Sequence, residues 1–135
     1  MTRREAREAL FVLLYEMTFN TPDELEQTIE TAKENRDLED QYILNSVHGI
    51  YDNLEAIDRE IEDNAKGWKL NRLSKTTLSI LRLSVYEMLY GEIPFTISIN
   101  EAVELAKKYD HDQAPTFING ILNTVASKNG LKEQK

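Results

Sequence analysis

The chain has 135 residues, 41% of them hydrophobic, and contains no cysteine, which fits one domain with its own core and excludes disulfides, thiolate metal sites and cysteine nucleophiles. The formal net charge of −8 at first argues against nucleic acid, because phosphate binding requires local positive charge. Residues 21–64 hold 14 acids and 3 bases, however, whereas residues 65–109 hold 7 bases and 4 acids, so a neutral-to-basic surface can be assembled outside the acidic third of the chain.

Apolar residues recur every three or four positions along the whole chain, which predicts an all-helical protein. The first helix is expected from Arg3 to Met17. Its second half is apolar almost all round, and such a helix is usually buried on several sides. The apolar stripe consists of Ala6, Leu10, Leu13, Leu14 and Met17, to which Phe11, Val12 and Tyr15 add.

The second helix has the start signal of a capping box, with Thr21 as cap, Pro22 in the first turn and Glu24 as the reciprocal partner. Its apolar face is thin, which predicts a peripheral position. That face consists of Leu25, Ile29 and Ala32.

Asp37 is predicted to cap the third helix, and a break near Asp52 and Asn53 is expected to divide the pattern that follows before it ends at Gly67. The core positions of this stretch are Ile43, Val47, Ile50, Leu54, Ile57 and Ile61.

Ser74 begins the next helix, where Leu73 and Leu78 form a hydrophobic staple. Gly91 and Pro94 are expected to end it. Its stripe consists of Leu78, Leu81, Val85, Met88 and Leu89.

Residues 98–101 (SINE) form a second capping box, which predicts that another helix starts at Ser98 with Glu101 as the partner of the cap. The last helix is expected to start near Asp112 or Ala114 and to close at Gly130. Its core face consists of Ile118, Ile121, Leu122 and Val125.

These elements predict an all-α, single-domain helical bundle of about six to seven helices. We expect residues 1–130 to form the folded domain and residues 131–135 to be a frayed tail. No apolar stretch approaches the ~18 residues of a membrane span and no signal peptide is evident, so a cytoplasmic location is expected.

No catalytic or metal-binding motif is present. His48 and His111 lie in neither of the spacings typical of helical metal sites, and the five glycines form no phosphate loop or dinucleotide fingerprint. We therefore expect a protein that is not an enzyme and needs no cofactor or metal. An enzyme that uses scattered carboxylates is a remote alternative.

Arg3, Arg4 and Arg7 are the first candidate functional residues. They precede the apolar part of the first helix, so all three are expected to project from the end of a rigid support. Guanidinium groups held in this way suit phosphate contacts and stacking on bases. The ordinary alternative is that they pair with Glu5 and Glu8 on a solvated helix end.

Phe117 is the second candidate, because it lies about 40° beyond the edge of the core stripe of the last helix. A partly exposed ring there would offer a stacking face to a base, although a core-edge aromatic is the commoner case. A third group consists of Lys66, Lys69, Arg72, Lys75 and Arg82, for which a solvated basic face is the default. Lys107 and Lys108 suit the last turn of a helix, where cations are favoured.

Four blocks of the chain, in order, resemble the NusB family of transcription antitermination factors. They are residues 3–15 (RREAREALFVLLY), 80–88 (ILRLSVYEM), 93–107 (IPFTISINEAVELAK) and 117–122 (FINGIL). The resemblance implies an all-helical fold of two small bundles. It also implies that the protein pairs with NusE, a small-subunit ribosomal protein, to bind the boxA element of ribosomal RNA leaders and to help RNA polymerase pass terminators.

Carried over to this chain, the resemblance implies that Arg3, Arg4 and Arg7 contact RNA and that Phe117 lies on the RNA surface. Matched positions with a less defined role are Arg82 and Lys107. Because the chain is acidic, we expect weak RNA binding alone and added phosphate contacts from a basic partner, which would dock on or near the acidic residues 21–64.

The alternative from another class is a protein-interaction helical module, or a homodimer, without direct RNA binding. A dimer that hides the three arginines would be an RNA binder stored in an inactive form.

Overall fold

The structure is a computed structural model that describes residues 1–20, 22–35 and 40–131. Within this part the chain forms seven α-helices and two short 3-10 turns and has no strand, so the all-α prediction is confirmed. The helices are α1 (Arg3–Met17), α2 (Leu25–Asn35), α3 (Gln41–Asp52), α4 (Leu54–Asn64), α5 (Lys75–Leu89), α6 (Phe95–Tyr109) and α7 (Ala114–Lys128), and the turns are η1 (Pro22–Glu24) and η2 (Leu70–Arg72).

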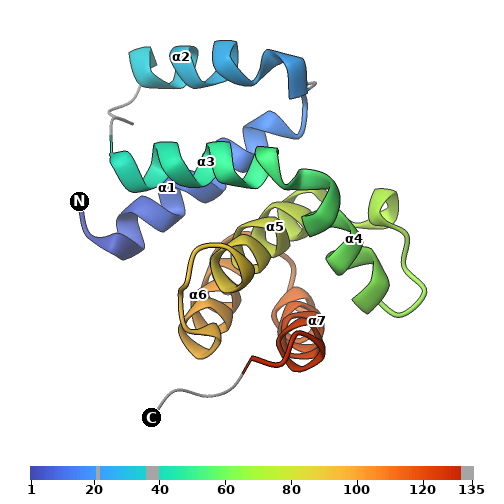
Figure 1. The fold of residues 1–135 in the computed structure, drawn as a ribbon. Coiled ribbons are helices and arrows are strands. Elements are labelled where there is room, and N and C mark those ends of the chain that lie inside the picture. Colours follow the sequence, from blue (N-terminus) through green and yellow to red (C-terminus); the bar gives the residue numbers. More distant parts are fainter. Residues whose placement is uncertain (21, 36–39, 132–135) are drawn as a thin grey trace.

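The helices form two small groups that share one core (Figure 1). The first group is α1, α2 and α3, and the second is α4, α5, α6 and α7. Helix α5 packs against α1 and α3 of the first group and against α4, α6 and α7 of its own. It therefore joins the two groups, whereas α2 packs mainly on α1 and lies at the periphery, as its thin apolar face predicts.

The core contains the apolar stripes that the periodicity predicts. Leu10, Ile43, Ile61, Leu81 and Ile118 are completely buried. Because the predicted stripes of α1, α3, α5 and α7 all face this core, the long helices are held by burial of apolar surface. None of the helices in the part that the structure describes is long and apolar enough to cross a membrane.

Two predicted helix boundaries are confirmed. Helix α1 spans Arg3–Met17, and α5 follows Ser74, whose hydroxyl accepts a hydrogen bond from the Thr77 amide at 3.1 Å. The predicted break between α3 and α4 lies at Asn53.

The starts of α2 and α3 come later than predicted. Residues 22–24 form the turn η1, so α2 begins only at Leu25, while Thr21, the predicted cap, lies outside the described residues. Asp37 also lies outside them. Helix α3 begins at Gln41 and is capped by Asp40, whose carboxylate accepts hydrogen bonds from the amides of the next turn. Asp40 directly precedes the first turn, so its carboxylate is placed to accept from those amides.

The predicted capping box at Ser98 is wrong. Helix α6 begins one turn earlier, at Phe95 after Pro94, and Ser98 is a completely buried residue inside it. Proline suits a helix start because it has no amide to leave unpaired. The Ser-x-x-Glu pattern therefore serves tertiary contacts, since Ser98 and Glu101 bind residues of other helices.

At the C-terminal end, α7 stops at Lys128 and Gly130 adopts a φ of +71°, as expected for a glycine that closes a helix. Leu131, which was expected to begin the frayed tail, donates its amide to the Ala126 carbonyl at 2.9 Å and packs against the core. Residues 132–135 lie outside the described part.

Candidate nucleic-acid interface

The first turn of α1 is fixed by a capping box that the sequence analysis did not identify. The Thr2 hydroxyl accepts a hydrogen bond from the Glu5 amide at 3.1 Å, and the Thr2 amide donates to the Glu5 carboxylate at 2.9 Å. The hydrogen bonds with Thr2 lower the pKa of Glu5 below its ordinary value. Glu5 is therefore a helix-capping residue among the arginines, and its cap holds Arg3 and Arg4 at a defined helix end.

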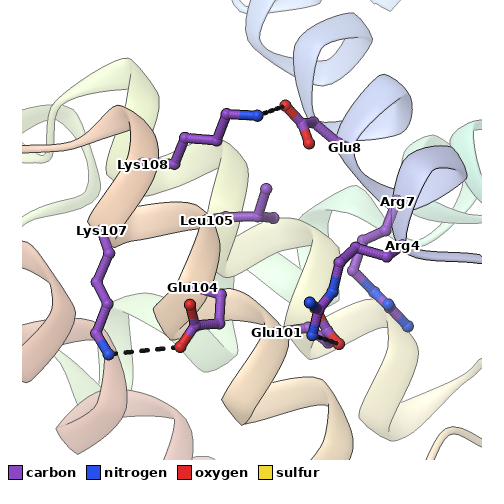
Figure 2. A pocket seen from close by; sticks show the side chains of 8 residues that line it. All are labelled: Arg4, Arg7, Glu8, Glu101, Glu104, Leu105, Lys107 and Lys108. Atoms are coloured by element: carbon purple, nitrogen blue, oxygen red, sulfur yellow. Dashed lines mark hydrogen bonds and ion pairs between the residues drawn. The ribbon is translucent and has the colours of Figure 1, made fainter.

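A groove of about 340 Å³ lies between the start of α1 and the second half of α6 (Figure 2). Its cations are Arg4, Arg7, Lys107 and Lys108, and its carboxylates are Glu8, Glu101 and Glu104. Both signs of charge alternate along it, so the groove is a set of ion pairs and not a purely basic patch.

Three of these cations are paired but remain on the surface. Arg4 donates two hydrogen bonds to Glu101, at 2.9 and 3.1 Å, yet its side chain is 68% exposed. Lys107 and Lys108 pair with Glu104 and Glu8 at 3.4 and 2.5 Å and are similarly exposed. Exposed ion pairs contribute little to stability, so each cation can exchange its carboxylate for a phosphate at small cost.

Glu8 connects the two helices that form the groove. Lys108 and the Tyr109 hydroxyl both donate to its Oε1 atom. These two hydrogen bonds lower the pKa of Glu8. The contact joins the middle of α1 to the last turn of α6 and so aligns the two walls of the groove.

Arg7 does not project as predicted. Its side chain is only 5% exposed and forms an ion pair with the buried Glu87 of α5, with Nε and Nη2 at 2.9 and 2.8 Å from Oε2. Burial is the largest single effect and lowers the pKa of Arg7, but the hydrogen bond to Glu87 and the attraction of the neighbouring negative charges together outweigh burial, so the pKa is raised. Arg7 lies one turn deeper along α1 than Arg3, where the helix has already entered the core.

Glu87 connects four helices. Besides Arg7 of α1, it accepts hydrogen bonds from the Tyr42 hydroxyl of α3 at 2.8 Å and from the Ser98 hydroxyl of α6 at 3.0 Å. Burial and the neighbouring Glu87 carboxylate raise the pKa of Tyr42, so its hydroxyl stays protonated and donates. Every oxygen of this buried carboxylate is thereby satisfied, which a buried charge requires.

Arg3 lies above the same network. Its guanidinium is 4.0 Å from the centre of the Tyr42 ring, an arrangement typical of a cation–π contact. Because Tyr42 is held by Glu87, the exposed Arg3 has a supported position although it forms no ion pair within the described residues.

Arg82 and Phe117 are also held by neighbours. Arg82 forms a two-point ion pair with Asp58 at 2.8 and 2.9 Å and is 12% exposed, which ties α5 to α4. Phe117 is half-buried, as its angular position suggests, and meets Trp68 edge-to-face with ring centres 6.2 Å apart. Trp68 is 52% exposed.

Trp68 was missed by the sequence analysis. The signal that points to it is a single tryptophan placed between Lys66 and Lys69, since an aromatic among bases is a common pattern at nucleic-acid surfaces. Among the described residues, no cluster of three or more His, Asp or Glu side chains that could hold a metal ion occurs.

Comparison with known proteins identifies the family to which the chain belongs. The model of the NusB family matches residues 4–127. The chain belongs to the NusB family. The resemblance seen in the sequence is therefore confirmed, and it extends over nearly the whole chain.

Individual members of the NusB family agree with this assignment. The chain is 46% identical over 131 residues to a transcription antitermination protein NusB from Clostridium novyi, covering 93% of this chain and 98% of the relative. The fold matches a NusB structure from T. maritima with a TM-score of 0.84 at 34% identity, covering 95% of this chain and 92% of that one. It also matches a structure of the antitermination factors NusB and NusE in complex with double-stranded RNA, with a TM-score of 0.77 at 27% identity, covering 93% and 96%.

Proposed function

We propose that this protein is a transcription antitermination factor that, together with NusE, binds boxA RNA of ribosomal RNA leader transcripts. The main support is the cationic start of α1, where Arg3 and Arg4 are exposed on a rigid helix in a family whose solved structures include a NusB–NusE–RNA complex. Such a factor would act on nascent RNA beside RNA polymerase in the cytoplasm, and its role involves no catalysis or cofactor.

In this proposal Arg3, Arg4 and Lys107 contact the RNA backbone. All three are exposed, and each is supported by a neighbour that a phosphate can replace or supplement. Phe117 supplies a stacking face. Arg7 and Arg82, which are buried in ion pairs, act by positioning: Arg7 anchors α1 on α5, and Arg82 anchors α4 on α5.

The alternating charges of the groove explain why a partner would matter. A phosphate that binds Arg4 or Lys108 lies beside the negative charge of Glu101 or Glu8, and this repulsion is expected to keep the RNA affinity of the protein alone low. A basic partner would add phosphate contacts. We propose that it docks on or near the acidic residues 21–64, and charge reversal there with unchanged partner binding would remove that docking site.

The decisive experiment measures binding of a single-stranded boxA oligonucleotide over a salt series, with and without NusE, for the natural protein and the variant Arg3→Ala/Arg4→Ala. We expect partner-enhanced binding that weakens with salt and is strongly reduced in the variant, whose salt dependence should be shallower by roughly 0.7 log units per lost phosphate contact.

The matched control is Lys128→Ala, because Lys128 is an exposed cation in the last turn of α7 that lies outside both the groove and the proposed docking segment. It should bind RNA like the natural protein. If the natural protein and NusE bind no RNA at any salt concentration, the proposed function is wrong and a protein-interaction module is the better description.

A further inference from the structure

A second cleft lies away from the groove of α1 and α6. It is formed where the loop after α4, the start of α5 and the turn between α6 and α7 meet, and its volume is about 320 Å³. Trp68 and Phe117 form its aromatic wall. Arg72 of the turn η2 and His111 of the turn before α7 also line it, together with the polar residues Ser74, Thr77 and Gln113.

The aromatic wall is open to solvent. Trp68 meets Phe117 at an angle of 72° between ring planes, so the two rings contact edge-to-face and are not stacked on one another. Half of the Trp68 surface is exposed although the residue lies beside a partly buried ring. An exposed indole held in place by a neighbour is a preformed stacking surface, because little side-chain freedom is lost on binding.

The charge of this cleft differs from that of the α1–α6 groove. None of the described residues that line it is an acid, and the Arg72 side chain is exposed and forms no ion pair or hydrogen bond within the described part of the chain. The adjoining turn holds two acids that do not line the cleft: Asp110, which is 4% exposed and accepts a hydrogen bond from the Thr77 hydroxyl at 2.6 Å, and the exposed Asp112. Arg72 is therefore available to an anion without displacing a carboxylate.

We propose that this cleft binds one unpaired nucleotide of single-stranded RNA, with its base stacked on Trp68 beside Phe117 and its phosphate on Arg72. Every base has a face that can stack on an aromatic ring, and an arginine provides the planar donors that a phosphate takes. A volume near 320 Å³ is at the lower end for small-molecule pockets, which suits a single nucleotide.

The position of the cleft makes it an extension of the proposed RNA interface. Lys107 and Lys108, at one wall of the α1–α6 groove, lie in the last turn of α6, and His111 follows within four residues of the chain at the edge of the cleft. In this proposal an RNA strand passes from the groove over the last turn of α6 to His111 at the edge of the cleft. The inference rests on the proposed function and adds a subsite that favours unpaired bases.

Trp68 is the only tryptophan of the chain, so its fluorescence reports on this subsite directly. The probe is the single-stranded boxA oligonucleotide in complex with the protein and NusE, with the signal corrected for any tryptophan of the partner by a titration of the Trp68→Phe complex. We expect quenching of Trp68 on addition of the single strand. The same oligonucleotide annealed to its complement should quench much less, because its bases are already paired.

Affinity is measured in parallel by the anisotropy of labelled RNA. Trp68→Ala should bind the single strand about 5- to 150-fold more weakly, the range expected for one lost base stack, while Trp68→Phe retains most of the affinity. Arg72→Ala should make the salt dependence shallower by roughly 0.7 log units. Lys128→Ala is again the matched control. If Trp68→Ala folds poorly, the proposal is still tested by the affinity of Trp68→Phe and by the fluorescence quenching of the natural protein.

Two results would overturn the subsite and leave the proposed function intact. One is RNA binding that is lost in Arg3→Ala/Arg4→Ala but accompanied by unchanged Trp68 fluorescence and unchanged affinity of Trp68→Ala. The other is a Trp68→Ala protein that loses NusE in the absence of RNA, which would make the cleft a protein-docking surface. Absence of RNA binding by the natural complex would overturn both proposals together.

Discussion

Arg7 and Arg4 lie one turn apart on α1 and yet have different physical roles. Arg4 is on the surface and exchanges partners easily, whereas Arg7 is enclosed with Glu87 where water cannot take its place. Removal of one partner of a buried ion pair leaves an uncompensated charge in the core. Whether an arginine of α1 is accessible to RNA therefore depends on its position along the helix.

Arg7→Ala is expected to lower the free energy of unfolding by about 3–5 kcal/mol, measured by urea denaturation, whereas Arg4→Ala should leave it little changed. The double variant Arg7→Met/Glu87→Leu should recover part of the loss, because it removes both charges. Equal stability of Arg7→Ala and Arg4→Ala would contradict the buried role of Arg7.

His48 illustrates a titratable contact at the same scale. Its Nδ1 lies 2.8 Å from the Leu44 carbonyl and its Nε2 lies 2.8 Å from the Glu26 carboxylate. Only the protonated ring can donate to both acceptors. The hydrogen bond to the Leu44 carbonyl, followed by that to Glu26, raises the pKa of His48 above its usual value.

The stabilisation from His48 should consequently be complete below its unfolded pKa and disappear as the pH rises through the higher folded pKa. Urea denaturation of the natural protein and His48→Gln should show a larger difference near pH 5.5 than near pH 8.5. The difference stays below about 1 kcal/mol, because the pair is exposed and screened by solvent. A difference in stability that grows with pH would contradict the predicted direction of the pH dependence.

At the scale of elements, α3 and α5 approach closely at Gly49. A Cβ atom at this position would lie 2.6 Å from the Tyr86 ring of α5, which is far inside van der Waals contact. Glycine is otherwise unfavourable within a helix by about 1 kcal/mol relative to alanine. The close approach of Tyr86 therefore requires a residue without a side chain here, although glycine has a low helix propensity.

Gly49→Ala should destabilise the natural protein, because a cost of about 1–3 kcal/mol for overpacking exceeds the gain in helix propensity. In a Tyr86→Leu background the same change should be neutral or stabilising. Thermal unfolding of the four proteins of this cycle measures the sign. Stabilisation by Gly49→Ala in the natural background would mean that Tyr86 moves aside freely.

For the whole molecule, the arrangement around α5 predicts how local stability is distributed. Helix α5 packs against five other helices, whereas α2 has its main contact with α1 only. Elements with few packed neighbours open at a lower free energy than the core of a domain. The first half of α1 is connected to α5 through the ion pair of Arg7 with Glu87, so it belongs to the stable part.

Native-state hydrogen exchange should accordingly show the slowest amides in the middle of α5 and a separate, lower opening free energy for α2. Glu87→Gln is expected to speed exchange in α1 and α6 as well as in α5, because the carboxylate joins all three. Uniform protection of α2 and α5 would show that the protein opens only as one unit.

The sequence by itself determined the helical class, the extents of α1 and α5 and most of the core, because apolar periodicity and helix caps are local properties. It also singled out Arg3, Arg4 and Phe117 and the family. Only the tertiary structure decided which side chains meet. Arg7 and Glu87 are 80 residues apart in the chain, and Ser98 and Glu101 bind other helices. Such contacts depend on how the helices pack in space, and the local spacing of residues in the sequence does not predict that packing. For the same reason Trp68 was identified as a candidate only from its contact with Phe117 in the structure.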